Sequence, residues 1–154
     1  MASRNIREKV DKGWIHAAII VEILGKPADY VDEAIKKIVD TFAENKDIDI
    51  LEKNIHKAKE IEHEDKKIEI FSAFAEIEFL ALNFSKLIEI IYDYMPSSIE
   101  IIEPSTMNIK IEDANALLND LATRLHQYDA LIKKSRIELQ LLQKKLEELE
   151  KGRK

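Results

Sequence analysis

The sequence predicts an α+β protein in which a domain of mixed strands and helices precedes one long helix. Residues 14–111 alternate β-branched runs with segments of helical periodicity, separated by glycine, proline and turn residues. From residue 118 to residue 149, apolar side chains recur at steps of three and four, which is the heptad pattern of a coiled coil. We therefore expect a polar lead-in (1–13), an α+β domain (14–112), a coiled-coil helix (113–150) and a short tail (151–154).

The first strand and helix are predicted from the run WIHAAIIVEIL, from Trp14 to Leu24. This run is nearly continuously apolar and β-branched, as in a central strand. Gly25-Lys26-Pro27 ends the strand, Pro27 suits a first helical turn, and Asp29 is able to cap it. The helix that follows carries apolar residues at helical spacing and ends near Asn45; they are Val31, Ala34, Ile35, Ile38 and Phe42.

A long hairpin is expected next. Residues 48–62 read as a lysine-rich edge strand, His63 to Lys66 as the turn, and residues 67–80 as the returning strand. A loop at Glu64-Asp65 would place Ile61 opposite Ile68, Ala58 opposite Phe71 and Lys53 opposite Glu76. In that register one face of the returning strand points to the core, with Phe71, Ala73, Ala75, Ile77 and Phe79.

A second helix, a short strand and the long helix complete the pattern. Phe84, Leu87, Ile88, Ile91 and Met95 have helical spacing, and Pro96 stops the helix. A short strand is expected from Ile99 to Glu103, a further extended segment from Met107 to Ile111, and a helix cap at Asp113.

The order strand–helix–strand–strand–helix–strand resembles the ferredoxin-like fold over about Trp14 to Ile111. Regulatory ACT-like domains and many RNA-binding modules share this topology. The resemblance implies a four-stranded antiparallel sheet with the first strand beside the third. No motif of a named family accompanies it, so it implies a fold without a function.

In that topology the sheet face away from the helices would be strongly apolar, with Ile20, Ile55, Ile70 and Phe74 exposed on it. A contiguous apolar face of this size is rarely left in water. We expect protein to cover it: the sheet of a second subunit, or the first turns of the long helix. A ligand or a nucleic acid is the alternative.

His16, Glu76 and Glu78 could converge at one end of the same face. An imidazole with two carboxylates is a possible metal shell or acid–base pair. A cross-strand ion-pair cluster explains the same residues. Because no H-x-x-E or H-E-x-x-H spacing is present, we predict no metal and no other cofactor.

The loop of Gly25, Lys26 and Asp29 resembles the place where ACT-like domains hold small ligands, and the resemblance implies a regulatory small-molecule site as one alternative function. A nucleic-acid-binding protein is a second. A net charge of −6 and the lack of the glycine–aromatic pattern of RNA-binding strands weigh against it.

The composition limits the cellular compartment and the kinds of site that we expect. The chain has no cysteine, so disulfides and thiolate metal sites are excluded, and a reducing cytoplasm is expected. The longest apolar stretch, from Ile15 to Leu24, is about half of what a bilayer requires, so no membrane anchor is expected. The emphasis on isoleucine, lysine and glutamate is typical of a thermophile or of an AT-rich genome.

The heptad seam is the most informative feature. Only Ser135 interrupts it, and its apolar members are Leu118, Leu121, Leu125, Tyr128, Ile132, Leu139, Leu142, Leu146 and Leu149. A helix from Asp113 to Glu150 would be roughly 55 Å long, beyond the diameter of so small a domain. The distal leucines therefore need a partner chain. We expect a non-enzymatic protein that assembles with itself, most of all as a dimer. A different protein is the other kind of partner that we expect.

Overall fold

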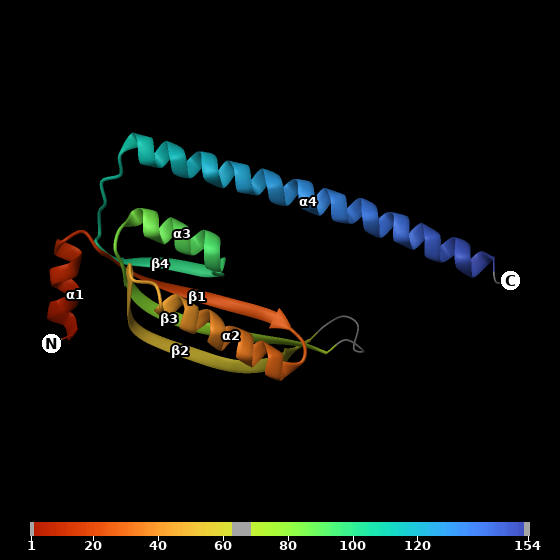
Figure 1. Ribbon diagram of the computed structural model, residues 1–154, viewed down its shortest axis with the longest axis horizontal. Coiled ribbons are helices and arrows are strands. Elements are labelled where there is room, and N and C mark those ends of the chain that lie inside the picture. Colours follow the sequence, from red (N-terminus) through yellow and green to blue (C-terminus); the bar gives the residue numbers. More distant parts are fainter. Residues whose placement is uncertain (1, 63–68, 153–154) are drawn as a thin grey trace. The chain divides into compact units, whose positions relative to one another are not determined.

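The computed structural model describes residues 2–62 and 69–152. The chain divides into two compact units, residues 1–107 and residues 108–154. The first unit is an α+β domain with a four-stranded antiparallel sheet, and the second contains a long C-terminal helix (Figure 1). The predicted turn from His63 to Lys66 and the predicted partner Ile68 lie outside the described residues.

The described chain begins with a helix, in the part that was expected to be a polar lead-in. In the first unit the elements are α1 (Ala2–Asp11), β1 (Ile15–Gly25), α2 (Ala28–Ala43), β2 (Ile48–Ile61), β3 (Ile70–Ala81), α3 (Phe84–Tyr94) and β4 (Ser98–Glu103). The second unit contains α4 (Ile111–Lys151). The strand order is β2-β3-β1-β4, so the first strand lies beside the third.

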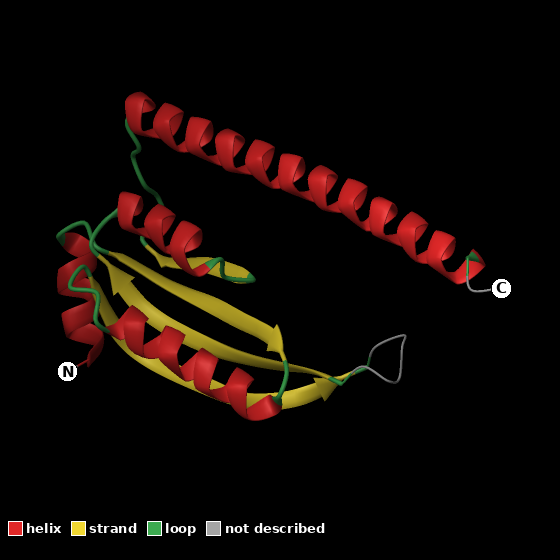
Figure 2. Ribbon diagram, turned by 45° about the vertical axis from the view of Figure 1, so that its right-hand side comes forward, coloured by secondary structure: helices red, strands yellow, loops and turns green. Residues whose placement is uncertain are grey.

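One face of the sheet is covered by α2 and α3 (Figure 2). The helix α2 presents Val31, Ile35, Val39 and Phe42, all fully buried, at spacings of four, four and three residues. The expected core face of β3 is found, because Ala73, Ala75, Ile77 and Phe79 are buried. From α3 the buried residues are Leu87 and Ile90.

Aromatic rings join the two helices to the sheet. The ring of Phe42 packs edge-on against Phe79 of β3, with centroids 5.0 Å apart, and against Tyr94 of α3, with centroids 5.1 Å apart. Such edge-to-face pairs contribute about 0.5–1.5 kcal/mol beyond the burial of area. Phe42 is therefore the residue at which both helices and the sheet meet.

Several predicted element ends are wrong. No side chain caps α2: its N-cap is Pro27, and its C-cap is Glu44 instead of Asn45. The helix α4 begins at Ile111, two residues before the predicted cap Asp113 and inside the segment expected to be extended. Met95 does not join the buried face of α3; it takes a left-handed conformation (φ 44°) as the C-cap and is 62% exposed. Helix ends depend on local contacts that periodicity does not record.

The hairpin register is correct only at one end. Ile50 lies opposite Phe79, as the predicted register requires. Irregularities between Ile50 and Glu52, and between His56 and Lys59, then shift the pairing by one residue each. As a result Ile61 lies opposite Ile70. A bulge inserts an unpaired residue and exchanges the two faces of the strand beyond it.

Phe42→Ala should lower the free energy of unfolding by about 3–5 kcal/mol, because a large buried ring and its two aromatic contacts are lost together. Urea unfolding followed by circular dichroism would measure this. Tyr30→Ala on the same helix, where Tyr30 is 61% exposed, is the matched control and should change the value by less than about 0.5 kcal/mol. Equal effects of the two substitutions would contradict this description of the core.

Candidate functional site

The candidate site is the face of the sheet opposite α2 and α3, which we call the open face. On β1 the core residues Ile19 and Val21 are buried. Side chains alternate between faces along a strand. Ala18, Ile20 and Glu22 therefore project to the open face.

Strand pairing arranges the open face in rows that cross the sheet from β2 to β4. One row contains three glutamates and consists of Glu52, Glu78, Ala18 and Glu100. The next row consists of Asn54, Glu76, Ile20 and Ser98. The middle of the open face is thus apolar on β1 and acidic on the strands beside it.

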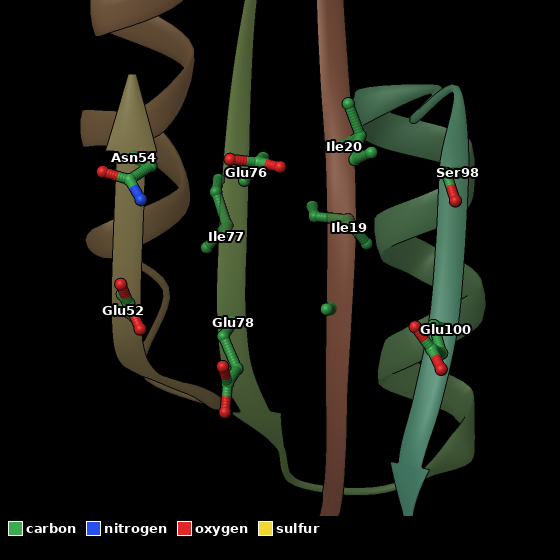
Figure 3. Close-up of a pocket in the computed structure, with 10 residues that line it drawn as sticks. Ile19, Ile20, Glu52, Asn54, Glu76, Ile77, Glu78, Ser98 and Glu100 are labelled. Carbon is green, nitrogen blue, oxygen red and sulfur yellow. The ribbon is translucent and has the colours of Figure 1, made fainter. Parts of the chain in front are cut away.

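These two rows line a hollow of about 310 Å³ (Figure 3). Four glutamates come from three strands, and no basic residue is among the lining residues. We call this hollow the glutamate groove, defined by Glu52, Glu76, Glu78 and Glu100 around Ala18 and Ile20. In Figure 3, Glu76 and Glu78 lie on β3, and Glu100 lies on β4 on the other side of β1.

One end of the open face is closed. His16 and Leu80 lie opposite each other there and are only 7% and 2% exposed. In the same row Asp49 forms an ion pair with Lys9 of α1, and Lys9 also lies 4.3 Å from the ring centroid of Trp14. The N-terminal helix is therefore fastened to this end of the sheet, and the groove begins beyond it.

The predicted cluster of His16, Glu76 and Glu78 does not form as one group. His16 Nε2 lies 2.6 Å from Glu78 Oε1, and its Nδ1 lies 3.8 Å from Glu103 Oε2. Glu76 instead contacts His56, with Oε2 3.0 Å from Nε2. Within residues 2–62 and 69–152, no three histidine or carboxylate side chains are arranged to hold a metal ion. Histidine–glutamate pairs that cross between strands account for these residues.

The far end of the open face is aromatic and apolar. Phe74 stacks on His56, with ring centroids 4.2 Å apart and planes 16° apart, and Ile70 lies opposite Ile61. Ile55 was expected on this face, and that prediction is wrong. It pairs with Ala75, a core residue, so it lies on the side of the helices.

Several residues of the groove were not predicted from the sequence. Glu52 and Asn54 face the groove only because the bulge after Ile50 exchanges the faces of β2. Ser98 and Glu100 face it because of the pairing between β4 and β1. The sequence signal that could have indicated these groove residues is the two-residue spacing of charged and polar side chains in β2 and in β4.

The predicted ligand loop has a packing explanation. A Cβ atom added to Gly25 would lie 3.3 Å from Val31 Cγ2, so the first turn of α2 crosses close to the end of β1. Lys26 and Asp29 are exposed. Neither hydrogen bonds nor ion pairs join these loop residues into one site within the described chain.

The predicted seam lies along α4. Its nine apolar residues are between 41% and 68% exposed, and none of the side chains described in α4 is buried. None of the helices in the described part of the chain is both long and apolar enough to cross a bilayer.

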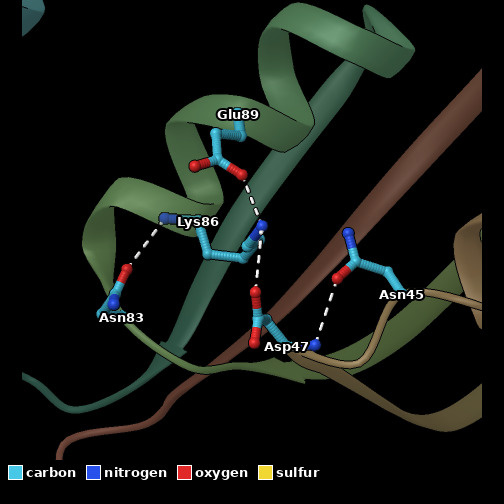
Figure 4. Close-up of polar contacts among 5 residues, drawn as sticks. All are labelled: Asn45, Asp47, Asn83, Lys86 and Glu89. Atoms are coloured by element: carbon cyan, nitrogen blue, oxygen red, sulfur yellow. Dashed lines mark hydrogen bonds and ion pairs between the residues drawn. The ribbon is translucent and has the colours of Figure 1, made fainter.

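Lys86 forms a second polar cluster, between α3 and the start of β2 (Figure 4). Its ammonium group contacts Glu89 and lies 3.3 Å from Asp47 Oδ2. Asn83 caps α3 by accepting a hydrogen bond from the Lys86 amide. The hydrogen bond to Glu89 is the largest cause that raises the pKa of Lys86; Asp47 adds to it, while burial opposes it. The cluster thus joins α3 to the segment at the start of β2.

Lys86→Met should lower stability near neutral pH by about 1 kcal/mol. Because the folded-state pKa is raised, the stabilising contribution is complete below the ordinary lysine value of about 10.4 and is lost as pH rises through the folded value. The difference in urea midpoint between the unmodified protein and the Lys86→Met variant should therefore become smaller as the pH rises from about 7 to about 11.5. Lys36→Met, at an exposed position on α2, is the control. A Lys86→Met difference that stays constant with pH would contradict the ion-pair assignment.

Comparison with known proteins gives one family. No curated protein and no solved structure matches the chain. The model of the MJ0538 family matches residues 16–154, a range that contains nearly all of β1 and all of the elements after it, including α4. The sheet domain and the long helix thus occur together in the family model, and the chain belongs to the MJ0538 family.

Proposed function

We propose that this protein is a non-enzymatic assembly protein whose α4 pairs with α4 of a second copy in a coiled coil. The observation that carries the proposal is the seam on α4. It extends over more than four heptads, and its nine apolar residues are exposed. Burial of one such side chain contributes about 1.5–3 kcal/mol. Pairing of two seams would therefore outweigh the cost of the single polar Ser135.

The dimensions of α4 support pairing between chains. With 41 residues, the helix is about 60 Å long. A single helix of this length with exposed leucines gains little from its own chain, whereas a second identical helix covers the seam along its full length.

We also propose a ferredoxin-like fold for the first unit. Support comes from the strand order β2-β3-β1-β4 and from α2 and α3, which each connect two strands and lie on the same face. This fold hosts many functions, so the assignment of an interaction role rests on the seam.

The groove weighs against the nucleic-acid alternative. A nucleic-acid surface needs cations for the phosphates, but this sheet face presents four glutamates around its hollow. The small-molecule alternative at Gly25 loses its main argument, since packing against Val31 explains the glycine.

Leu139→Asp combined with Leu142→Asp should convert the assembly to monomers while the sheet domain stays folded. Each substitution places a carboxylate in the centre of the seam, where pairing would bury it unpaired. Light scattering would report the molar mass, and circular dichroism the fold. Gln127→Asp with Ala130→Asp, at outer heptad positions, adds the same two charges and should leave the mass unchanged. An unchanged mass for the seam variant would reject the proposal.

The helices are expected to run parallel. With Leu118 at position a, a parallel pair brings Arg124 near Asp129 of the second copy and Lys145 near Glu150 of the second copy, and no like charges meet. Each exposed pair contributes less than about 1 kcal/mol, so the preference for this orientation is small.

A Leu149→Cys variant tests the direction. The chain has no other cysteine, so mild oxidation should join the two identical sites rapidly if the helices are parallel. A cysteine at 149 that crosslinks only to one placed at 118 would show antiparallel helices.

A further inference from the structure

We propose that the glutamate groove is a docking site for α4 of a second copy, through a face of that helix outside the seam. The docking element is a lysine patch, defined as Ile137 and Leu141 with Lys133, Lys134, Lys144 and Lys145. The seam is not used in this contact, so the proposal stands or falls separately from the coiled coil.

The groove has an electrostatic reason to bind a cation. Glu52 and Glu78 lie directly opposite each other on β2 and β3, and like charges in this arrangement destabilise a sheet. Glu78 contacts His16. For Glu52 and Glu100, the described chain provides no ion pair. Ammonium groups placed over this row would offset the repulsion.

The lysine patch has a composition complementary to the groove. Between residues 131 and 146 there are five basic residues and one acidic residue, Glu138. Lys133 and Lys134 pair along the helix with Asp129 and Glu138, which leaves Lys144 and Lys145 as the lysines of the patch to which the described part of the chain gives no ion pair. Ile137 and Leu141 are 58% and 54% exposed and are one helical turn apart, at heptad positions f and c. These positions lie on the side of the helix away from the seam, so the seam does not explain why they are apolar.

The dimensions of the two surfaces agree. Lys133 and Lys144 are 11 residues apart, which is about 16 Å along a helix. Four strands spaced by about 4.8 Å place β2 and β4 about 14 Å apart. A helix that crosses the strands would therefore set its lysines over Glu52 at one edge and Glu100 at the other.

The centres of the two surfaces also match. Between the acidic edges, β1 presents Ala18 and Ile20 to the groove. Between the lysine pairs, α4 presents Ile137 and Leu141. Apolar side chains would thus meet apolar side chains, and charges of opposite sign would meet around them.

A second copy is the occupant that these features favour. The patch lies about 40 Å along the helix axis from Ile111, at the far half of a continuous helix. A second sheet is a poor occupant, because two glutamate grooves face to face would bring carboxylates together. The face of α4 supplies the charge and the apolar centre that the groove lacks.

Crosslinking between two single-cysteine variants tests the contact. Ser98→Cys places a thiol at the groove, and Gln140→Cys places one beside the patch, in a chain that has no cysteine of its own. Equal amounts of the two full-length variants, each also carrying Leu139→Asp and Leu142→Asp to remove the seam, are mixed and mildly oxidised. We expect mixed dimers to form at least about fivefold faster than with Thr123→Cys in place of Gln140→Cys, a ratio that corresponds to about 1 kcal/mol. Residue 123 is on the same side of α4 but outside the patch.

Charge reversal supplies the second readout. Lys144→Glu with Lys145→Glu should reduce the crosslinking rate to that of the Thr123→Cys control, and Glu76→Lys with Glu100→Lys in the groove chain should restore it. Equal rates for Gln140→Cys and Thr123→Cys, or no response to charge reversal, would overturn the proposal. A chain carrying both Ser98→Cys and Gln140→Cys that closes on itself at a rate independent of concentration would also overturn it, in favour of docking within one chain.

Discussion

The position of β1 between β3 and β4 is the constraint on which the rest of the sheet domain depends. β1 pairs with β3 from Ile15 to Gly25 and with β4 from His16 to Ile20. Its alternate residues therefore form the middle of the core on one side and the floor of the glutamate groove on the other. Because β1 has neighbours on both sides, glutamates from β3 and β4 are brought to the two sides of Ala18 and Ile20. A strand at the sheet edge could not produce this arrangement.

The two faces of this sheet have different physical roles. The helix-facing side is apolar and closed, with Phe42 at the meeting point of three elements. The open face is acidic in the middle, closed by α1 at one end and aromatic at the other. An acidic face with an apolar floor is suited to a cationic, amphipathic partner, and α4 has such a surface in addition to its seam. In this proposal one helix would serve two contacts, because Ile137 and Leu141, the apolar centre of the lysine patch, lie on the side of α4 away from the seam.

Much of the fold follows from periodicity in the sequence. The central strand, the buried faces of α2 and β3 and the long C-terminal helix could be predicted because each has a strong apolar pattern at its own period. Which side chains of β2 face the helices and which face the groove could not be predicted. The polar sequence of this strand favours neither side strongly, and the bulge between Ile50 and Glu52 moves Ile55 to the side of the helices and Glu52 to the groove. The site was missed for the same reason: the convergence of Glu52, Glu78 and Glu100 depends on register across three pairs of strands, which alternation alone does not determine.

In the proposed function this chain assembles with itself through α4. Sedimentation equilibrium of the unmodified full-length protein over a wide range of concentration tests it most directly. We expect a molar mass of at least twice the 17.8 kDa of one chain at micromolar concentration, with dissociation only on dilution. A mass of 17.8 kDa at every concentration, with the protein folded, would contradict it.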